Sequence, residues 1–410
     1  HGGNMRNERT LADSRLPSLT GLRFVAALLV FFFHLSVEKL YDDGANPVLS
    51  KIFNPAGGVG VSFFFILSGF VLAWSAKPNR PAREFWRRRL AKIYPNHLLL
   101  WVLTLPLLLL FGEQVAAGSA TANLALVQTW VPRLDFFFSV NRPSWSLCCE
   151  LFFYLMFPLL ARFVGRLGRT GTWTLVAATV AGVWLLPVAA GLLQGGPGMP
   201  LDVSHPELDS GVSVRQYWLV YAFPVSRCLE FLLGIAVAKL VKDGAWPRIP
   251  VAVATGLLAI GYAAAVQAPV LYGLSAITVI PLTLFIPAVT MSDLEGRKSP
   301  LRSRSMVWLG EVSFAFYLVH QTVLRIGHDL LGHDRSWNAW TASALAAAFA
   351  AVTLLLAWAV YRWWEMPAMR LLTTRRSHRK SVPVAAGGPL VRPGTELAAR
   401  RPAEAAADKS

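Results

Sequence analysis

The sequence predicts an all-α membrane protein, a polytopic bundle of about ten transmembrane helices. Hydrophobic residues make up 54% of its 410 residues and charged residues only 15%, whereas a soluble globular chain carries about 25% charged residues. The mean hydropathy is +0.46, and 24 Phe and 15 Trp add to the apolar content. This composition is typical of a polytopic membrane protein, and it excludes a soluble multi-domain enzyme.

Ten apolar runs define the predicted spans. A helix needs about 20 apolar residues to cross a hydrocarbon core of about 30 Å, and each run is near that length. The stretch 249–290 is the least regular and could instead be one long hairpin. The runs occupy residues 19–37, 57–76, 94–112, 144–162, 172–192, 217–239, 249–267, 270–290, 306–326 and 340–361.

The segments outside the runs complete the domain organisation. The first run lacks the small-residue cleavage site of a signal peptide, so we expect a retained span. It follows a short N-terminal tail, residues 1–15, whose first four residues precede a Met and are expected to be an expression scar. One transmembrane domain is predicted over residues 16–367. The tail 373–410 is rich in Ala, Pro, Gly, Arg and Glu, and we expect it to be disordered because it cannot bury a core.

Positive charges are distributed unevenly between the two sides of the predicted bundle. The net charge is +16 and the pI about 10.3, which in a soluble chain would suggest nucleic-acid binding. Here 30 of the 39 Lys and Arg residues fall on the side that holds both termini, and seven fall on the other side. Because positively charged loops stay in the cytoplasm, both termini are predicted to be cytoplasmic. We expect no nucleic-acid partner.

Ionisable residues inside apolar spans are energetically costly and therefore indicate function. At a rise of about 1.5 Å per residue, His34 in the first span, Glu150 in the fourth and His320 in the ninth lie roughly 21–22 Å from the inner ends of their spans. A His beside a carboxylate at one depth has the composition of a general base and the group that orients it. The alternative is a hydrogen bond between helices that only holds the bundle together.

Other polar residues in the spans have simpler interpretations. Arg227 and Glu230 in the sixth span are three residues apart, so they can neutralise each other on one helix face. His320 can instead belong to a polar seam with Ser313 and Tyr317. These readings favour a structural role over a chemical one.

The three cysteines, Cys148, Cys149 and Cys228, all lie in apolar stretches. Their spacing indicates neither a disulfide framework nor a metal site. An apolar setting also keeps a thiol unreactive. We therefore expect no bound metal and no cysteine nucleophile.

A basic cluster precedes the third span on the predicted cytoplasmic side. Arg89 and Lys92 are three residues apart, so on a helix they face the same way and could hold the phosphates of a nucleotide-bearing donor. The alternative is ordinary positive flanking of a span, or contact with lipid headgroups. The cluster comprises Arg83, Arg87, Arg88, Arg89 and Lys92.

Five sequence motifs occur in order along the chain. Together they resemble the acyltransferase-3 family of integral membrane O-acyltransferases, over about Leu16 to Pro367. One of them is similar to the family's signature of an Arg and a His eleven positions apart in the first span. The motifs are Leu16–Arg23 followed by His34, Gly60–Phe70, Phe85–Pro95, Trp145–Tyr154 and Ser313–His320.

The resemblance implies transfer of an acyl group, commonly from acyl-CoA, to a hydroxyl of a sugar or another acceptor. It implies that His34 and Arg23 carry catalysis with support from Glu150, and that Arg88, Arg89 and Lys92 engage the donor. No tightly bound cofactor is implied, and acyl-CoA is a co-substrate. Further residues near the substrates are expected to be Trp145, Ser146, Arg227, Tyr317 and His320.

Two departures from the family pattern bear on the function. Lys92 stands where a second Arg is usual, which keeps the charge but loses the bidentate fork. The last span is followed by no hydrolase-like region, so the chain resembles the compact subgroup that acylates macrolide antibiotics as well as cell-envelope glycans.

The Arg- and Ala-rich composition favours the antibiotic branch, with O-acetylation of an envelope polysaccharide or glycolipid as the alternative. The predicted location is the bacterial cytoplasmic membrane. A 17 Å rise between Arg23 and His34, about eleven residues of helix, favours donor positioning by Arg23 over contact with the reacting atoms. A proton-coupled transporter is the rival class, because buried His, Glu and Arg also suit a carrier.

Overall fold

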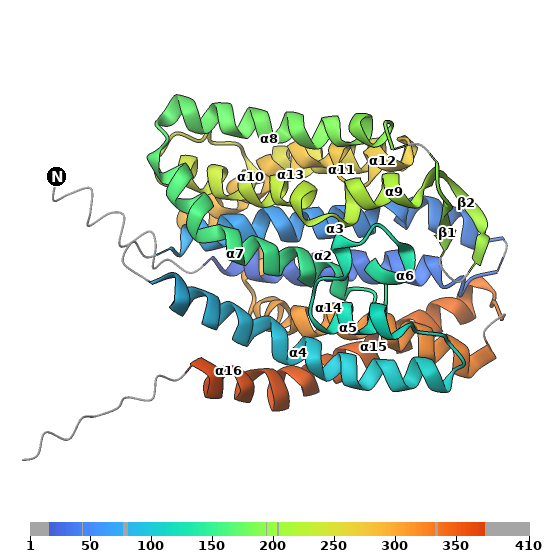
Figure 1. The fold of residues 1–410 in the computed structure, drawn as a ribbon. Coiled ribbons are helices and arrows are strands. Elements are labelled where there is room, and N and C mark those ends of the chain that lie inside the picture. Colours follow the sequence, from blue (N-terminus) through green and yellow to red (C-terminus); the bar gives the residue numbers. More distant parts are fainter. Residues whose placement is uncertain are drawn as a thin grey trace, which may run out of the picture. The chain divides into compact units, whose positions relative to one another are not determined.

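The structure is a computed structural model that describes residues 16–42, 44–76, 81–193, 195–202, 205–332 and 335–373. Long helices run alongside one another through the described part of the chain (Figure 1). Each of the ten predicted runs falls chiefly on one of them. These helices are α2 (Pro17–Val37), α3 (Asn46–Trp74), α4 (Ala82–Leu110), α7 (Ser144–Arg166), α8 (Arg169–Ala190), α10 (Pro224–Lys242), α11 (Val251–Gln267), α13 (Ala276–Leu294), α14 (Arg304–Gly332) and α15 (Ala339–Val360).

The prediction of a polytopic all-α membrane bundle is confirmed, with a difference in the number of spans. Among the described residues, eight helical segments are long and apolar enough to cross a membrane. Helix α11 has only 17 residues, and α14 has 29 but carries charged residues along its length. Both still pack inside the bundle, α11 on α13 and α14 on α2 and α15. The side of the membrane that each end faces stays a prediction.

The two longest loops contain short elements of their own. Between α4 and α7 lie α5, η1 and α6, and between α8 and α10 a two-stranded antiparallel hairpin leads into α9 and the π-helical segment η2. The hairpin lies at one end of the bundle, on the right of Figure 1, which we call the hairpin end. These elements are α5 (Ala117–Leu124), η1 (Gln128–Trp130), α6 (Leu134–Phe137), β1 (Gly198–Asp202), β2 (His205–Ser213), α9 (Val214–Tyr217) and η2 (Trp218–Ala222).

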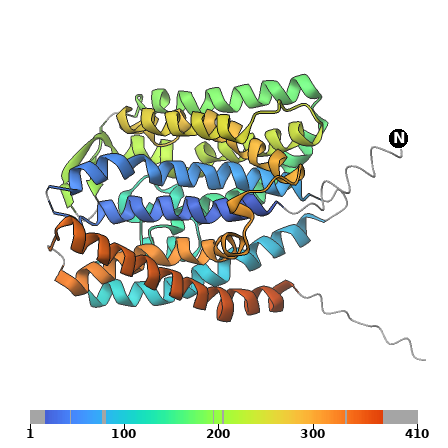
Figure 2. The same cartoon turned by 180° about the vertical axis from the view of Figure 1, so that it is seen from behind.

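At the opposite end, which we call the α16 end, the chain leaves α15 through a second π-helical segment. This segment, η4 (Tyr361–Glu365), continues into the short helix α16 (Met366–Thr373). Figure 2 shows α15, η4 and α16 as one nearly continuous rod in orange and red. Two further short elements, α12 (Val270–Gly273) and η3 (Pro300–Arg302), precede α13 and α14.

A central row of helices, α14, α2, α3 and α10, forms the core of the bundle. Helices α3 and α10 approach closely because each offers a glycine to the other's backbone. A Cβ at Gly69 would meet the carbonyl of Phe231, and a Cβ at Gly234 would meet the carbonyl of Ile66. Small residues at such crossings let membrane helices pack backbone to backbone. Replacing Gly69 or Gly234 by a larger residue would therefore push α3 and α10 apart.

The start of α2 is held by a residue far away in the sequence. Pro17 occupies the first turn, and the Asp293 carboxylate on α13 accepts hydrogen bonds from the Ser18 amide (2.9 Å) and hydroxyl (2.6 Å). A carboxylate at a helix N-terminus satisfies unpaired amides and interacts favourably with the helix dipole. This contact fixes the position of α2, which carries both Arg23 and His34.

Candidate active site

His34 lies in the last turn of α2, towards the hairpin end. Its Nδ1 is 3.0 Å from the Val30 carbonyl oxygen and 3.1 Å from Nε2 of His320 on α14. Nδ1 of His320 is in turn 2.6 Å from the Tyr317 carbonyl oxygen. The structure therefore brings together the two histidines that the sequence placed at one depth.

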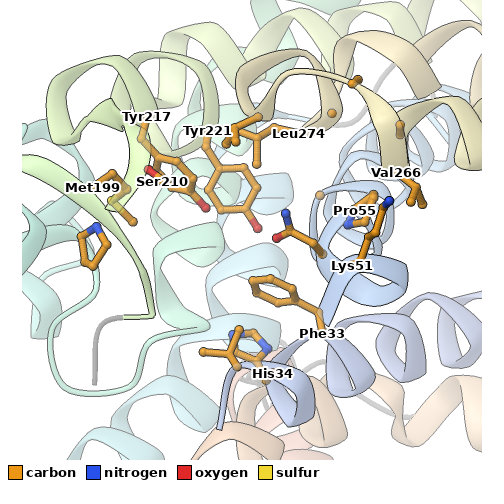
Figure 3. Close-up of a pocket in the computed structure, with 18 of the residues that line it drawn as sticks. Phe33, His34, Lys51, Pro55, Met199, Ser210, Tyr217, Tyr221, Val266 and Leu274 are labelled. Carbon is orange, nitrogen blue, oxygen red and sulfur yellow. The ribbon is translucent and has the colours of Figure 1, made fainter. Parts of the chain in front are cut away.

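His34 borders a cavity of about 170 Å³, which we call the His34 cavity. Figure 3 shows His34 and Phe33 on one side of this space, with Tyr217 and Tyr221 across from them and Lys51 at another edge. The aromatic rings in its walls come from α2, α7, α9, η2 and the residue that follows α6. The full lining is Phe33, His34, Val37, Lys51, Asn54, Pro55, Gly58, Phe138, Arg142, Trp145, Met199, Pro200, Ser210, Tyr217, Tyr221, Ala265, Val266, Ala268, Val270, Gly273 and Leu274.

Glu150 does not contact His34, which corrects the expectation that this carboxylate orients the imidazole. Its Oε2 accepts a hydrogen bond from the Tyr154 hydroxyl (3.1 Å), and it borders a different cavity. The depth estimate failed because α7 begins inside the bundle. Asn141, just before α7, is buried and donates to the Leu318 carbonyl on α14 (3.1 Å). Glu150 lies six residues after Ser144, where α7 begins, and is therefore about 9 Å deeper at the helical rise.

The second cavity, of about 320 Å³, collects most of the predicted donor residues, and we call it the Arg89 cavity. Long helices supply most of its wall, and η4 and α16 border it at the α16 end. Three cations and two carboxylates line it. The full lining is Thr20, Arg23, Val61, Phe64, Phe65, Leu67, Ser68, Val71, Leu72, Arg89, Lys92, Ile93, Ser146, Leu147, Glu150, Tyr154, Gly310, Glu311, Ser313, Phe314, Tyr317, Tyr361, Met366 and Met369.

Two guanidinium groups in the Arg89 cavity retain hydrogen-bonding capacity. Arg89 lies over the rings of Phe85 (5.6 Å) and Tyr154 (5.9 Å), and its buried Nε has no hydrogen-bond partner among the described residues. Arg23 and Arg89 both interact electrostatically with Glu150, and the described residues give Arg23 no hydrogen bond through its side chain. These groups can therefore bind an anionic ligand.

Arg23 and His34 border different cavities, as expected for residues eleven positions apart on one helix. Arg23 lies towards the α16 end and His34 towards the hairpin end of α2. Arg23 therefore cannot contact the atoms that react at His34 in this arrangement.

Two of the predicted donor residues have other partners. Arg88 donates to Glu84 on the same helix (2.8 Å), its side chain is 45% exposed, and it lines neither cavity. Lys92 borders the Arg89 cavity, but its ammonium group is paired with the Glu365 carboxylate. Glu365 also accepts a hydrogen bond from the Asn96 side chain (2.6 Å). Lys92 thus anchors η4 to α4. Of the two cations that the sequence predicted on one face of this helix, only Arg89 lacks a carboxylate paired with it by a salt bridge among the described residues.

The two cavities adjoin at the first turn of α7. Trp145 lines the His34 cavity and the next residue, Ser146, lines the Arg89 cavity. The Ser146 and Tyr317 hydroxyls are 2.9 Å apart. The rings of Phe64 and Tyr317 lie 5.8 Å apart, and those of Phe65 and Trp145 lie 6.1 Å apart. We call these five side chains the partition. Three of the predicted substrate residues, Trp145, Ser146 and Tyr317, belong to it.

Arg227 and His320, the other two predicted substrate residues, line neither cavity. Arg227 pairs with Glu230 (3.0 Å), donates to Ser62 (3.2 Å) and lies over the rings of Phe65 (5.0 Å) and Tyr221 (5.6 Å). It therefore supports one ring from each cavity without reaching either space. The structural interpretation of Arg227 and Glu230 agrees with these contacts.

Several residues at the His34 cavity were not found from the sequence. Arg142 interacts electrostatically with His34, and Lys51 lines the same space. Tyr217 and Tyr221 also line it, and their rings lie 5.0 Å apart. Arg142 lies in the loop before α7, and the two tyrosines lie on the short elements α9 and η2, for which spacing along the sequence offers no signal.

The described residues thus form a multi-pass membrane protein in which a cationic cavity adjoins a cavity with a histidine in its wall. No group of three or more His, Cys, Asp or Glu side chains in the described ranges is placed to hold a metal ion. A base next to an anion-binding space is an arrangement suited to group transfer.

The family model described as "Acyltransferase domain" matches residues 16–362, so the chain belongs to the acyltransferase-3 family. Acyltransferase MdmB of Streptomyces mycarofaciens is 38% identical over 375 residues, which cover 88% of this chain and 94% of that protein. This membership makes the protein an O-acyltransferase, and the enzymatic interpretation is confirmed over the transporter alternative.

Two more distant relatives are longer proteins. The putative peptidoglycan O-acetyltransferase YrhL of Bacillus subtilis is 26% identical over 79% of this chain and 51% of its own length. The peptidoglycan O-acetyltransferase OatA of Listeria monocytogenes is 25% identical over 88% of this chain and 57% of its own length. This chain therefore spans about half the length of these two relatives. No solved structure matches this chain.

Proposed function

We propose that the enzyme moves a short acyl group from acyl-CoA to a hydroxyl of a macrolide antibiotic or a similar glycosylated natural product. The donor occupies the Arg89 cavity and the acceptor the His34 cavity. The observation that carries this proposal is the division of chemistry between the two adjoining cavities. One has an imidazole in its wall, and the other has guanidinium groups with free hydrogen-bonding capacity.

His34 acts as the general base in this proposal. The Val30 carbonyl, 3.0 Å from Nδ1, can only accept a hydrogen bond, so Nδ1 carries the proton and Nε2 holds the lone pair. In the described residues Nε2 has no hydrogen-bond partner, and His34 lines the cavity. An acceptor hydroxyl that enters the cavity would therefore meet an imidazole in the form that can take its proton.

The Arg89 cavity suits the donor. Its volume of about 320 Å³ is within the range of small-molecule sites, about 300–1,000 Å³. Arg89 and Arg23 bind phosphate or carbonyl oxygens of the donor at the α16 end, and Glu150 holds both guanidinium groups in place through charge attraction. The apolar wall beyond them, with Phe64, Phe65 and others, accommodates the acyl-bearing arm.

Transfer takes place where the cavities adjoin. His34 Nε2 removes the proton of the acceptor hydroxyl while its oxygen attacks the thioester carbonyl. The carbon–sulfur bond of the tetrahedral intermediate then breaks, and the imidazolium returns the proton to the CoA thiolate. The partition must admit the thioester for this step, because it separates the donor space from His34.

The acceptor is proposed from the size and lining of the His34 cavity. At about 170 Å³ it is below the usual range for a whole small-molecule ligand, so it admits one sugar ring or ring edge while the rest of the acceptor stays outside. Its aromatic walls supply large apolar contact areas. The relatives named as peptidoglycan O-acetyltransferases are only 25–26% identical to this chain, against 38% for acyltransferase MdmB, which favours a small glycosylated acceptor over an envelope polysaccharide or glycolipid.

The α16 end faces the cytoplasm of a bacterial cell in this proposal. The basic segment at the start of α4 and the border formed by α16 both lie there, and positively charged flanks stay on the cytoplasmic side. Acyl-CoA would then enter the Arg89 cavity from the cytoplasm.

The test is a thermal-shift titration of the purified protein with CoA and acetyl-CoA. A ligand that binds only the folded state stabilises it by RT ln(1 + [L]/Kd), so the melting temperature starts to rise once the ligand concentration exceeds Kd. We expect this rise with CoA and acetyl-CoA, and we expect Arg89→Ala to weaken the fitted affinity about 10- to 100-fold, the usual effect of losing a hydrogen bond to a charged group. Arg87→Ala, an exposed arginine of the same helix that lines neither cavity, is the matched control and should bind normally.

Mass spectrometry of reactions with macrolide and glycan acceptors then identifies the product. No stabilisation by CoA or acetyl-CoA at millimolar concentration would contradict the proposed donor. Acylation of a peptidoglycan or glycolipid fragment, with no macrolide product, would contradict the proposed acceptor.

A further inference from the structure

We propose that His320 is the positioning residue for His34 and occupies the place that a carboxylate holds in many catalytic dyads and triads. The inference rests on the proposed function, in which His34 is the base. It assigns to His320 a part in catalysis without contact with either substrate, since it lines neither cavity.

The hydrogen bonds of the two rings determine where each proton lies. The Tyr317 carbonyl can only accept, so Nδ1 of His320 donates to it across 2.6 Å. This leaves the lone pair of His320 on Nε2, and that atom lies 3.1 Å from Nδ1 of His34. Nδ1 of His34 therefore donates, and both of its neighbours, His320 Nε2 and the Val30 carbonyl, accept.

The result is a directed chain of hydrogen bonds from the backbone of α14 to the cavity. Each imidazole donates through Nδ1 and presents Nε2 to the next group along. For His34 the next group is whatever occupies the cavity. This is the tautomer that a general base needs, and it is held without a carboxylate.

The surroundings of His320 strengthen this arrangement. His320 is 0% exposed, and its ring lies parallel to Phe316 (10°, 6.4 Å) and near Phe31 (6.4 Å). Phenyl rings offer no competing hydrogen bond to Nε2, and a dry environment makes the remaining bond stronger. When His34 gains a proton, its Nδ1 proton can shift towards His320, so that two rings share the positive charge.

A purely structural role is the alternative, in which His320 packs α14 against α2. Two substitutions separate the roles. His320→Phe keeps an aromatic ring in this aromatic pocket but removes the acceptor. His320→Gln gives up the ring but places an amide oxygen near the position of Nε2, where it can accept from His34.

If His320 positions the base, His320→Phe should lower kcat about 10- to 100-fold, comparable to the cost of losing the group that orients a metal-binding histidine. KM values for donor and acceptor should stay within about threefold, and His320→Gln should recover most of kcat. If His320 only packs, the order reverses, with His320→Phe active and His320→Gln impaired, and the proposal is overturned. Melting temperatures of both variants show whether each is folded.

A second measurement does not depend on activity. In protein labelled with ¹⁵N-histidine, the ring nitrogen shifts report which nitrogen of His34 is protonated, and His34→Gln identifies its signals. We expect protonated Nδ1, unprotonated Nε2, and a nitrogen–nitrogen coupling across the hydrogen bond to His320. Protonation of His34 at Nε2 would overturn the proposal.

These outcomes separate this inference from the proposed function. Full transfer by His34→Gln would remove His34 as the base, whatever the coupling shows. An inactive His34→Gln with a fully active His320→Phe would overturn the role of His320 alone.

Discussion

The two cavities differ in the kind of structure that builds them. The Arg89 cavity is walled mainly by long helices, α2, α3, α4, α7 and α14. The His34 cavity shares α2 and α3, but the hairpin, the loop before α7, η2 and the residues around α12 supply much of the rest. Long helices hold their side chains rigidly, whereas loops and irregular segments tolerate change. Under the proposed assignment, donor binding is carried by regular structure, and acceptor recognition largely by irregular structure.

The first and largest test of this comparison is His34→Gln. Loss of a general base lowers the rate about 100- to 10,000-fold, while the donor site in the other cavity stays intact. We expect transfer to fall by that amount in a product assay, with CoA affinity unchanged in the thermal-shift titration. Weakened CoA binding would show that the two cavities are coupled rather than separate.

The second prediction, of intermediate size, concerns the acceptor KM of a variant at the His34 cavity. Tyr217 lines the His34 cavity at the end of α9, with its ring 5.0 Å from that of Tyr221. An aromatic contact contributes about 0.5–1.5 kcal/mol beyond its buried area, so Tyr217→Ala should raise the acceptor KM about tenfold. CoA affinity should not change. An unchanged acceptor KM together with a raised donor KM would reverse the assignment of the cavities.

The smallest effect on activity is expected from the Lys92–Glu365 pair. Lys92→Met leaves the Glu365 carboxylate, 1% exposed, without its cation, and an uncompensated buried group costs about 1–3 kcal/mol or more. The melting temperature should therefore fall, and Lys92→Met with Glu365→Gln should restore much of it. CoA affinity of the double variant should stay within about twofold of the wild type.

Arg88→Ala is the control for the Lys92 variants, because it removes an exposed ion pair of the same helix. Its exposed pair with Glu84 contributes only about 0.3–0.5 kcal/mol, so neither stability nor CoA affinity should change measurably. A large loss of CoA affinity in the Lys92 double variant would instead show that Lys92 binds the acyl donor and pairs with Glu365 only while the donor is absent.

Helix positions could be predicted from the sequence because apolar runs of bilayer length leave few alternatives. Arg23, Arg89 and His34 could also be chosen in advance, since charged and titratable groups in or beside spans are rarely incidental. The sequence did not pair His34 with His320, but the equal depths estimated for the two residues would have allowed that prediction.

The partner of Glu150 could not be predicted in this way. Depth estimates assume that each helix begins at the membrane surface, whereas α7 begins inside the bundle, shortly after the buried residues Ser139, Val140 and Asn141. The pairing of Lys92 with Glu365 was equally hidden, since the two residues are 273 positions apart. Long-range pairs of this kind leave no periodic signal in a single sequence.

The π-helical segments η2 and η4 bear on how such an enzyme can change. A π turn holds one residue more than an α turn, and each residue of a helix advances the face by about 100°. Where the helix continues through the π turn, as from η4 into α16, the extra residue sets the helical phase of the residues that follow, whereas η2 ends at the extended residue Phe223 before α10 begins. Tyr221 of η2 borders the His34 cavity, and Tyr361 of η4 borders the Arg89 cavity.

A one-residue insertion or deletion in η4 would turn α16 and present a new set of side chains to the Arg89 cavity. Loss of one residue would rotate Met366 and Met369 away from this cavity, while the length of the helix would change by only about 1.5 Å. The Arg89 cavity thus has a point beside it where a change of one codon replaces the side chains of one wall.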